Sequence, residues 1–145
     1  MDTQMTLPTT FEKFAYSFLG EKVTVTLNNN QLMIGTLLNV RPDFVQIFGN
    51  YLGRIVYNMS EIFSITVHGK KEKNIEFFHS VDNRLYKKFN SFLNRNIEIR
   101  RENNCKNRIE GKLLYLGRDY FVVANEYERW IACVLLTDDT VVKIV

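Results

Sequence analysis

The sequence predicts a mainly β protein, built as two small five-stranded barrels in tandem, each preceded by a short α-helix. Three observations support this prediction: an internal repeat, a two-residue period of apolar side chains in each copy, and one glycine at the same place in both copies. The composition fits a folded chain. Of 145 residues, 46% are hydrophobic and 24% are charged, which excludes intrinsic disorder and a collagen-like chain.

Two blocks of sequence recur in the same order. Residues 18–27, FLGEKVTVTL, match residues 92–101, FLNRNIEIRR. Residues 35–47, GTLLNVRPDFVQI, match residues 111–123, GKLLYLGRDYFVV. A chance match explains one shared block, but two blocks in the same order indicate duplication.

The rest of each copy also corresponds. The second copy gains two residues around 103–107, between the two blocks. Each copy then carries an apolar stretch, for which we equate Ile55–Tyr57 with Trp130–Ala132. A closing apolar stretch follows, at Ile62–Val67 and at Val141–Val145.

The apolar period in each copy is that of β-strands. Val23, Val25 and Leu27 alternate with polar residues, and so do Ile97 and Ile99. This alternation predicts strands with one buried and one solvated face.

Gly35 and Gly111 interrupt the second predicted strand of each copy. Glycine inside a strand usually marks a sharp bend or a close backbone approach, as at a barrel corner. Asp43 and Asp119 follow in tight turns, where we expect each carboxylate to bond its own backbone. Five short strands with a bent second strand predict an SH3-like barrel, whose sheet curls onto itself and so protects its edges.

A helical stretch precedes each predicted barrel. Thr9 or Thr10 caps residues 11–19, and Ser80 caps residues 81–93. We expect each apolar stripe to cover the open end of its own barrel; the stripes are Phe11, Phe14, Phe18 and Leu19, and Leu85, Phe89 and Phe92.

These patterns divide the chain into a first helix and barrel at residues 1–67, a linker at 68–79, and a second helix and barrel at 80–145. Residues 1–67 have a net charge of −1 and residues 68–145 of +4, so the whole basic surplus lies in the second part. Ordinary solvated surface accounts for this level of charge.

No residue pattern typical of an enzyme is present, so we predict no catalytic, cofactor-binding or metal-binding residues and no cofactor. His68 and His79 flank the linker without a carboxylate at metal-ligand spacing. Asp138 and Asp139 fit a solvated turn better than a metal or acid–base pair. Cys105 and Cys133 lack a CxxC spacing, and we interpret both as reduced structural thiols.

The basic stretch Arg95–Lys112 contains six Lys or Arg and three Glu. With Tyr115, Tyr120 and Tyr127 nearby, it could stack bases and contact phosphates of a single-stranded nucleic acid. The interspersed glutamates weaken this hypothesis, and an exposed barrel face accounts for the same residues.

Nothing in the sequence predicts secretion or membrane insertion. Residues 1–5 have neither the basic nor the apolar region of a signal peptide. No stretch reaches the roughly 18 apolar residues that span a bilayer. We expect synthesis in the cytoplasm.

A helix followed by five strands, with Gly-x-Leu before an Asp-apolar pair, resembles the Sm-like fold. Sm-like proteins bind RNA through an Asn after the third strand's turn and a later Arg-Gly pair. Here Asp43-Phe44-Val45-Gln46 lacks the Asn, and Arg54 and Arg129 precede Ile55 and Trp130. The resemblance therefore does not imply the RNA pocket.

The repeats also resemble the repeat domain of spore coat protein B of endospore-forming bacteria. The resemblance is carried by residues 22–25, 35–45, 55–57 and 61–65, and by their counterparts in the second copy. It covers nearly the whole chain from Phe11, without the Ser- and Lys-rich tail that such proteins can carry.

The resemblance implies a structural, non-enzymatic component of the spore coat or spore surface. Its partners would be other coat proteins and further copies of itself, joined by protein–protein contacts. Tyr51, Tyr127 and Trp130 lie near predicted turns, where we expect them to be exposed. Two other classes remain open: an Sm-like nucleic-acid-binding module, and a small-molecule or enzymatic module with a deep pocket between the barrels.

Overall fold

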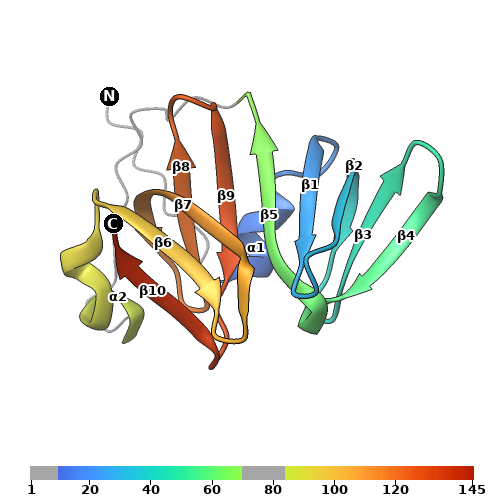
Figure 1. Cartoon of the computed structure of the whole chain (residues 1–145). Helices are drawn as coiled ribbons and strands as arrows, with labels where there is room; N and C mark the ends of the chain where they lie inside the picture. The colour runs from blue at the N-terminus through green and yellow to red at the C-terminus, as the bar shows by residue number, and fades with distance from the viewer. Residues whose placement is uncertain (1–9, 70–83) are drawn as a thin grey trace, which may run out of the picture.

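The computed structural model describes residues 10–69 and 84–145, which are mainly β (Figure 1). In chain order these residues form α1 (Phe11–Tyr16), β1 (Lys22–Leu27), β2 (Leu32–Val40), β3 (Phe44–Gly49), β4 (Gly53–Asn58), β5 (Ile62–His68), α2 (Arg84–Phe89), β6 (Asn96–Arg101), β7 (Asn104–Leu116), β8 (Tyr120–Asn125), β9 (Trp130–Leu135) and β10 (Thr140–Ile144). One 3-10 turn precedes β5 and another follows α2. Both described helices have six residues, too few to cross a lipid bilayer.

The described strands form one open antiparallel sheet in the order β10-β6-β7-β8-β9-β5-β1-β2-β3-β4. The mainly β prediction is confirmed. The closure of each half into its own barrel is not confirmed, because β5 pairs with β9 of the other half. The backbone groups of β5 that would have turned toward β4 are used in this pairing.

The two halves share one strand order. The first half runs β5-β1-β2-β3-β4 and the second runs β10-β6-β7-β8-β9. Register shifts also fall at matching places, after Leu37 in β2 and after Leu113 in β7. The repeat detected in the sequence is therefore also a repeat of pairing.

The two mid-strand glycines allow a close approach of the backbone. A Cβ on Gly35 would lie 2.5 Å from the carbonyl oxygen of Phe48, and one on Gly111 would lie 2.7 Å from that of Ala124. Both distances are well inside van der Waals contact, so only glycine fits. The close approach expected at these positions is confirmed.

The predicted alignment of the fourth strands is wrong by two residues. Ile47 lies opposite Ile55 in the first half, and its counterpart Val123 lies opposite Ala132 in the second. Ile55 therefore corresponds to Ala132, not to Trp130. A shift of two residues preserves the alternation of faces, so the apolar pattern could not reveal it.

Two hydrophobic cores lie on opposite faces of the sheet. The inner faces of β1, β2, β3 and β5 form the first core, and those of β6, β7, β8 and β9 form the second. Because successive side chains of a strand alternate, Cys133 joins the first core while Val134 joins the second. The strands β8 and β9 are consequently covered on both faces.

The prediction that the helix α1 covers only its own half is wrong. This helix covers the contact between the two halves. It contacts β2 and β9, and Figure 1 shows it at the middle of the molecule, where the two halves meet. Its Phe11 and Phe14 rings have centroids 6.4 and 5.4 Å from that of Tyr120. Thr10 caps it as expected, since its Oγ1 accepts a hydrogen bond from the Lys13 amide. We call the β5–β9 pairing together with this helix contact the junction.

The helix α2 behaves as predicted for a cover over its own half. Leu85, Phe89 and Phe92 pack against the second core, and the Phe89 ring meets Phe121 edge-on with centroids 5.2 Å apart. The predicted cap, Ser80, lies outside the described residues.

Candidate functional site

The junction is built from opposed apolar side chains of β5 and β9. Ile65 lies opposite Cys133, and both are fully buried. The Cys133 thiol donates to the carbonyl oxygen of Ile65 at 3.6 Å, and burial raises its pKa to about 12. This cysteine is therefore a protonated packing residue, as its structural interpretation predicted.

Asp119 has a role that the sequence did not reveal. Its Oδ1 accepts a hydrogen bond of 2.7 Å from the amide of Phe11, the first residue of α1. The expected carboxylate bond to its own turn is thus wrong, because the carboxylate reaches across the junction to an unsatisfied helix N–H. Asp43, the counterpart of Asp119, is exposed on the first half.

The tyrosines proposed as a stacking surface are mostly inaccessible. Tyr115 and Tyr120 are buried, and burial raises the pKa of both phenols. Tyr127 is 99% exposed and stands in the turn between β8 and β9. Two of the three rings therefore cannot receive a base.

Arg101, in the middle of the basic stretch, is a buried structural cation. Its guanidinium donates to Asn28 Oδ1 at 3.0 Å and to Thr140 Oγ1 at 2.7 Å, and it lies 4.8 Å from the ring centroid of Phe63. Burial lowers its pKa, an effect that Asp139 partly opposes. Its charge ties the second half to the β1–β2 turn.

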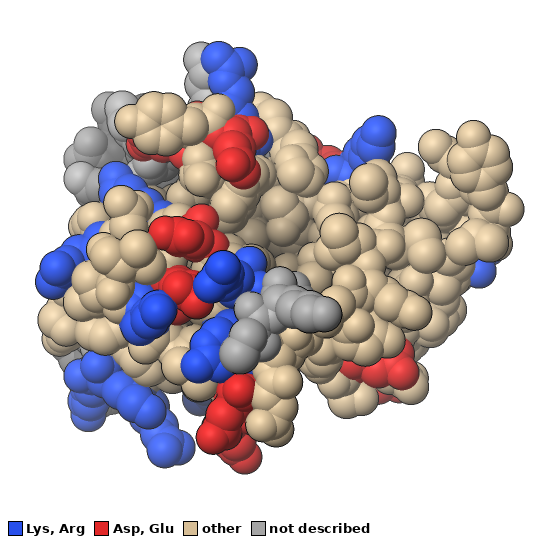
Figure 2. Space-filling view, in the orientation of Figure 1, with Lys and Arg blue, Asp and Glu red and all other residues tan. Residues whose placement is uncertain are grey.

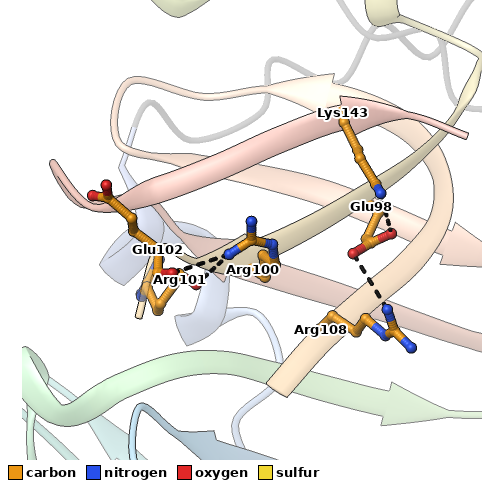
Figure 3. A network of polar contacts seen from close by, with 6 residues as sticks. All are labelled: Glu98, Arg100, Arg101, Glu102, Arg108 and Lys143. Carbon is orange, nitrogen blue, oxygen red and sulfur yellow. Dashed lines mark hydrogen bonds and ion pairs between the residues drawn. The ribbon is translucent and has the colours of Figure 1, made fainter. Parts of the chain in front are cut away.

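Other charges of the basic stretch are paired on the sheet (Figure 3). The largely buried carboxylate of Glu98 lies 3.7 Å from Arg108 and 3.5 Å from Lys143. Arg100 donates to the backbone oxygens of Arg101 and Glu102. These groups are held by neighbours and do not form one uninterrupted cationic surface.

An open groove of about 760 Å³ lies beside the junction, where the small-molecule alternative expects a pocket. Charges of both signs line it, including Arg108, Glu110 and Glu128. His68 Nε2 lies 3.3 Å from Thr24 Oγ1, and Trp130 donates its indole N–H to Glu128. Trp130 is therefore half-buried, not exposed as predicted.

The remaining candidate residues do not converge on one site. Asp138 and Asp139 are exposed in the turn before β10, where Thr137 donates to Asp139. His79 and the side chain of Cys105 lie outside the described residues. Within the described ranges, no group of three or more His, Cys, Asp or Glu gathers as a metal site.

The first half exposes more large apolar side chains than the second half, where Tyr127 and Val145 are exposed. In Figure 2 the face over β1 to β4 is mostly uncharged, whereas charged side chains crowd the second half. The exposed large apolar residues of β2, β3, β4 and the turn between β3 and β4 are Leu32, Ile34, Leu38, Phe48, Tyr51, Leu52 and Val56. Exposure of Tyr51 and Tyr127 is confirmed.

The two sheet ends are the other unusual feature. Within the described residues, β4 pairs only with β3 and β10 pairs only with β6. Each therefore presents one row of backbone N–H and C=O groups that no described strand occupies.

Comparisons with protein families, with curated proteins and with solved structures find no match to this chain.

Sequence reasoning found the repeat and its glycines but missed the junction. Pairing between β5 and β9 joins residues far apart in sequence, and each strand alone has an ordinary alternating pattern. One signal was available: Tyr120, Val122 and Ala124 are apolar on the face opposite Phe121 and Val123. Apolar residues on both faces indicate a strand covered on both sides.

Proposed function

We propose that this chain is a structural, non-enzymatic protein that assembles through protein–protein contacts, as a component of a bacterial spore coat or spore surface. The spore-coat assignment rests on the resemblance of the two repeats to spore coat protein B. The partners would be other coat proteins and further copies of this chain.

We further interpret each half as a barrel of the Sm-like or SH3-like type that has been opened. The common strand order, the matched glycines and the matched register shifts support this interpretation. An opened barrel exchanges its internal closure for pairing with a neighbour, which suits a protein whose task is assembly.

The observation that carries the assembly proposal is an open sheet with an exposed apolar face at one end. Single exposed apolar residues are ordinary, but a group of them beside an unpaired edge favours association. Phe48 and Val56 are 45% and 56% exposed and lie on the last two strands of the sheet. In an isolated monomer these exposed apolar side chains and the unpaired strand edge contribute no stabilising contact.

The burial of Tyr115 and Tyr120 and the pairing of Glu98 argue for assembly over the nucleic-acid alternative. The distinction is measurable, because binding through phosphate contacts weakens steeply as salt rises. Tight, salt-sensitive binding of a short oligonucleotide would favour that alternative.

Sizing of the purified chain over a concentration series tests the proposal. We expect the mean mass to rise with concentration above that of one 17.1 kDa chain. A strictly monomeric species at the highest soluble concentration would contradict assembly. Production of the chain in growing cells, and not only in developing spores, would contradict the spore-coat assignment.

A further inference from the structure

The repeat makes the strands of the junction comparable with the strands at the sheet ends. By register, β9 corresponds to β4, and β5 corresponds to β10. The chain itself pairs β5 with β9. Their counterparts, β10 and β4, are not paired with each other but lie at opposite ends of the sheet (Figure 1).

The junction covers the outer face of the second half, which is the face that points away from that half's own core. There Ala124 is 4% exposed and Cys133 is fully buried, and α1 packs over Tyr120. Asp119 completes the contact by accepting from the first amide of α1.

In the part of the chain that the structure describes, the corresponding face of the first half has no such cover. Phe48 occupies the position of Ala124, and Val56 that of Cys133, and both are exposed. Asp43, at the position of Asp119, is exposed as well. Phe48 and Val56 are thus apolar and exposed at the positions where, in the second half, the counterpart residues are buried by the junction.

The opposite end of the sheet carries the complementary strand. Ile65 lies opposite Val25 in the first half, and Val142 lies opposite the counterpart Ile99 in the second. Val142 thus holds the position that Ile65 holds at the junction. It already packs against the second core, so its strand is ordered before any partner arrives.

We propose that a second copy of this chain occupies the β4 edge, its β10 pairing antiparallel with β4 so that the ten-stranded sheet continues from one molecule to the next. This inference rests on the proposed assembly function and specifies its geometry. In the register of the junction, Val142 lies opposite Val56 and Lys143 lies opposite Ile55. The contact is head-to-tail, and it generates a ring if the rotation closes and a filament if it does not.

The charges of the two edges favour this register. Arg54 and Lys143 are both exposed, and in this pairing their side chains lie on opposite faces of the joined sheet. A slip by one residue in one direction places Lys143 directly opposite Arg54, where like charges repel, and a slip in the other direction places it opposite the apolar Val56. Either slip also turns the apolar side chains to the wrong face.

Cross-linking between two proteins, each with one introduced cysteine beside the fully buried Cys133, tests the register. In a Cys105→Ser background, one protein carries Val56→Cys and the other carries Val142→Cys; a second matched set carries Ile55→Cys and Lys143→Cys. Opposed residues of paired strands have Cβ atoms about 4.5–5.5 Å apart, near the range of a disulfide. The crossed mixtures, 56 with 143 and 55 with 142, place the thiols on opposite faces and serve as controls.

We expect a disulfide-linked dimer in the matched mixtures, at least tenfold above the crossed mixtures. Equal yields in matched and crossed mixtures, or self-linkage of the Val56→Cys protein alone, would overturn the head-to-tail register. Should Val142→Cys perturb the fold, as judged by urea unfolding, the pair at the half-buried Ile55 and the exposed Lys143 decides. Association without matched cross-links overturns this inference and leaves the proposed function standing, whereas a monomer at every concentration overturns both.

Discussion

The junction and the sheet ends use the same strand positions of the repeat in opposite ways. At the junction, β5 covers β9, and Cys133 is fully buried. At the end of the first half, β4 has no described partner on its outer side, and Val56 at the same position is 56% exposed. One repeat position is thus a core residue in one copy and a surface residue in the other.

The difference teaches that neighbouring strands, not the repeat's sequence alone, decide what is core. The second half is covered on both faces because the first half and α1 pack against it. Among the described residues, only one face of the first half is covered. Substitutions at matched positions of the two halves therefore measure what the junction contributes.

The largest expected difference is at Tyr120. Tyr120→Ala removes a fully buried ring that contacts Phe11, Phe14 and Tyr115, and we expect it to lower the free energy of unfolding by about 3–5 kcal/mol. Phe44→Ala, at the matched half-buried position, should cost clearly less. Urea unfolding of both variants checks this, and equal losses would contradict the asymmetry between the halves.

The glycines come next, and here the two halves should agree. Gly35→Ala and Gly111→Ala each force a Cβ against a backbone carbonyl, and each should cost about 1–3 kcal/mol. Gly49→Ala is the control, because a Cβ there meets its neighbours only at 3.8 Å or beyond. Thermal unfolding measures all three, and a tolerated Gly35→Ala would refute the close approach.

The matched aspartates should differ by a smaller amount. Asp119→Ala removes the acceptor for the first amide of α1, at a cost of about 1 kcal/mol. Asp43→Ala should leave the stability of the monomer nearly unchanged, since Asp43 is exposed. Chemical denaturation at low protein concentration makes the comparison, and the reverse order of losses would count against the junction.

The smallest effect on stability is expected at the open edge. Val56→Lys should change the free energy of unfolding by less than about 0.5 kcal/mol while weakening association strongly, because it places a charge in the proposed contact. Leu32→Lys adds the same charge at another exposed apolar position, whose counterpart Arg108 stays exposed beside the junction. Sedimentation at several concentrations compares association of the two variants. Equal weakening by Val56→Lys and Leu32→Lys would indicate non-specific hydrophobic association.

The sequence revealed what is local and what is repeated. The alternation of Val23 and Val25, the paired glycines and the Thr10 cap all follow from short-range stereochemistry and were predicted. The open sheet was not, because an alternating strand such as β5 has the same pattern whether it closes a barrel or pairs with β9. Which strand lies beside which is decided by packing over long sequence separations.

The candidate site was less predictable for the same reason. The basic stretch looked like a surface, but Arg101 folds inward onto Phe63. Asp119 looked like a turn residue, and its partner Phe11 lies at the other end of the chain. Charge and turn propensity describe a residue's own neighbourhood, and neither reports a distant partner.

The accessibility of position 56 as the protein associates tests the central claim most directly. In a Cys105→Ser background, the remaining native thiol, Cys133, should stay unreactive toward a thiol reagent in the folded chain, since burial raises its pKa to about 12. A cysteine introduced by Val56→Cys should react readily in dilute solution and progressively more slowly as the concentration rises, because β10 of a second copy covers it. A labelling rate at position 56 that is independent of concentration would contradict the account.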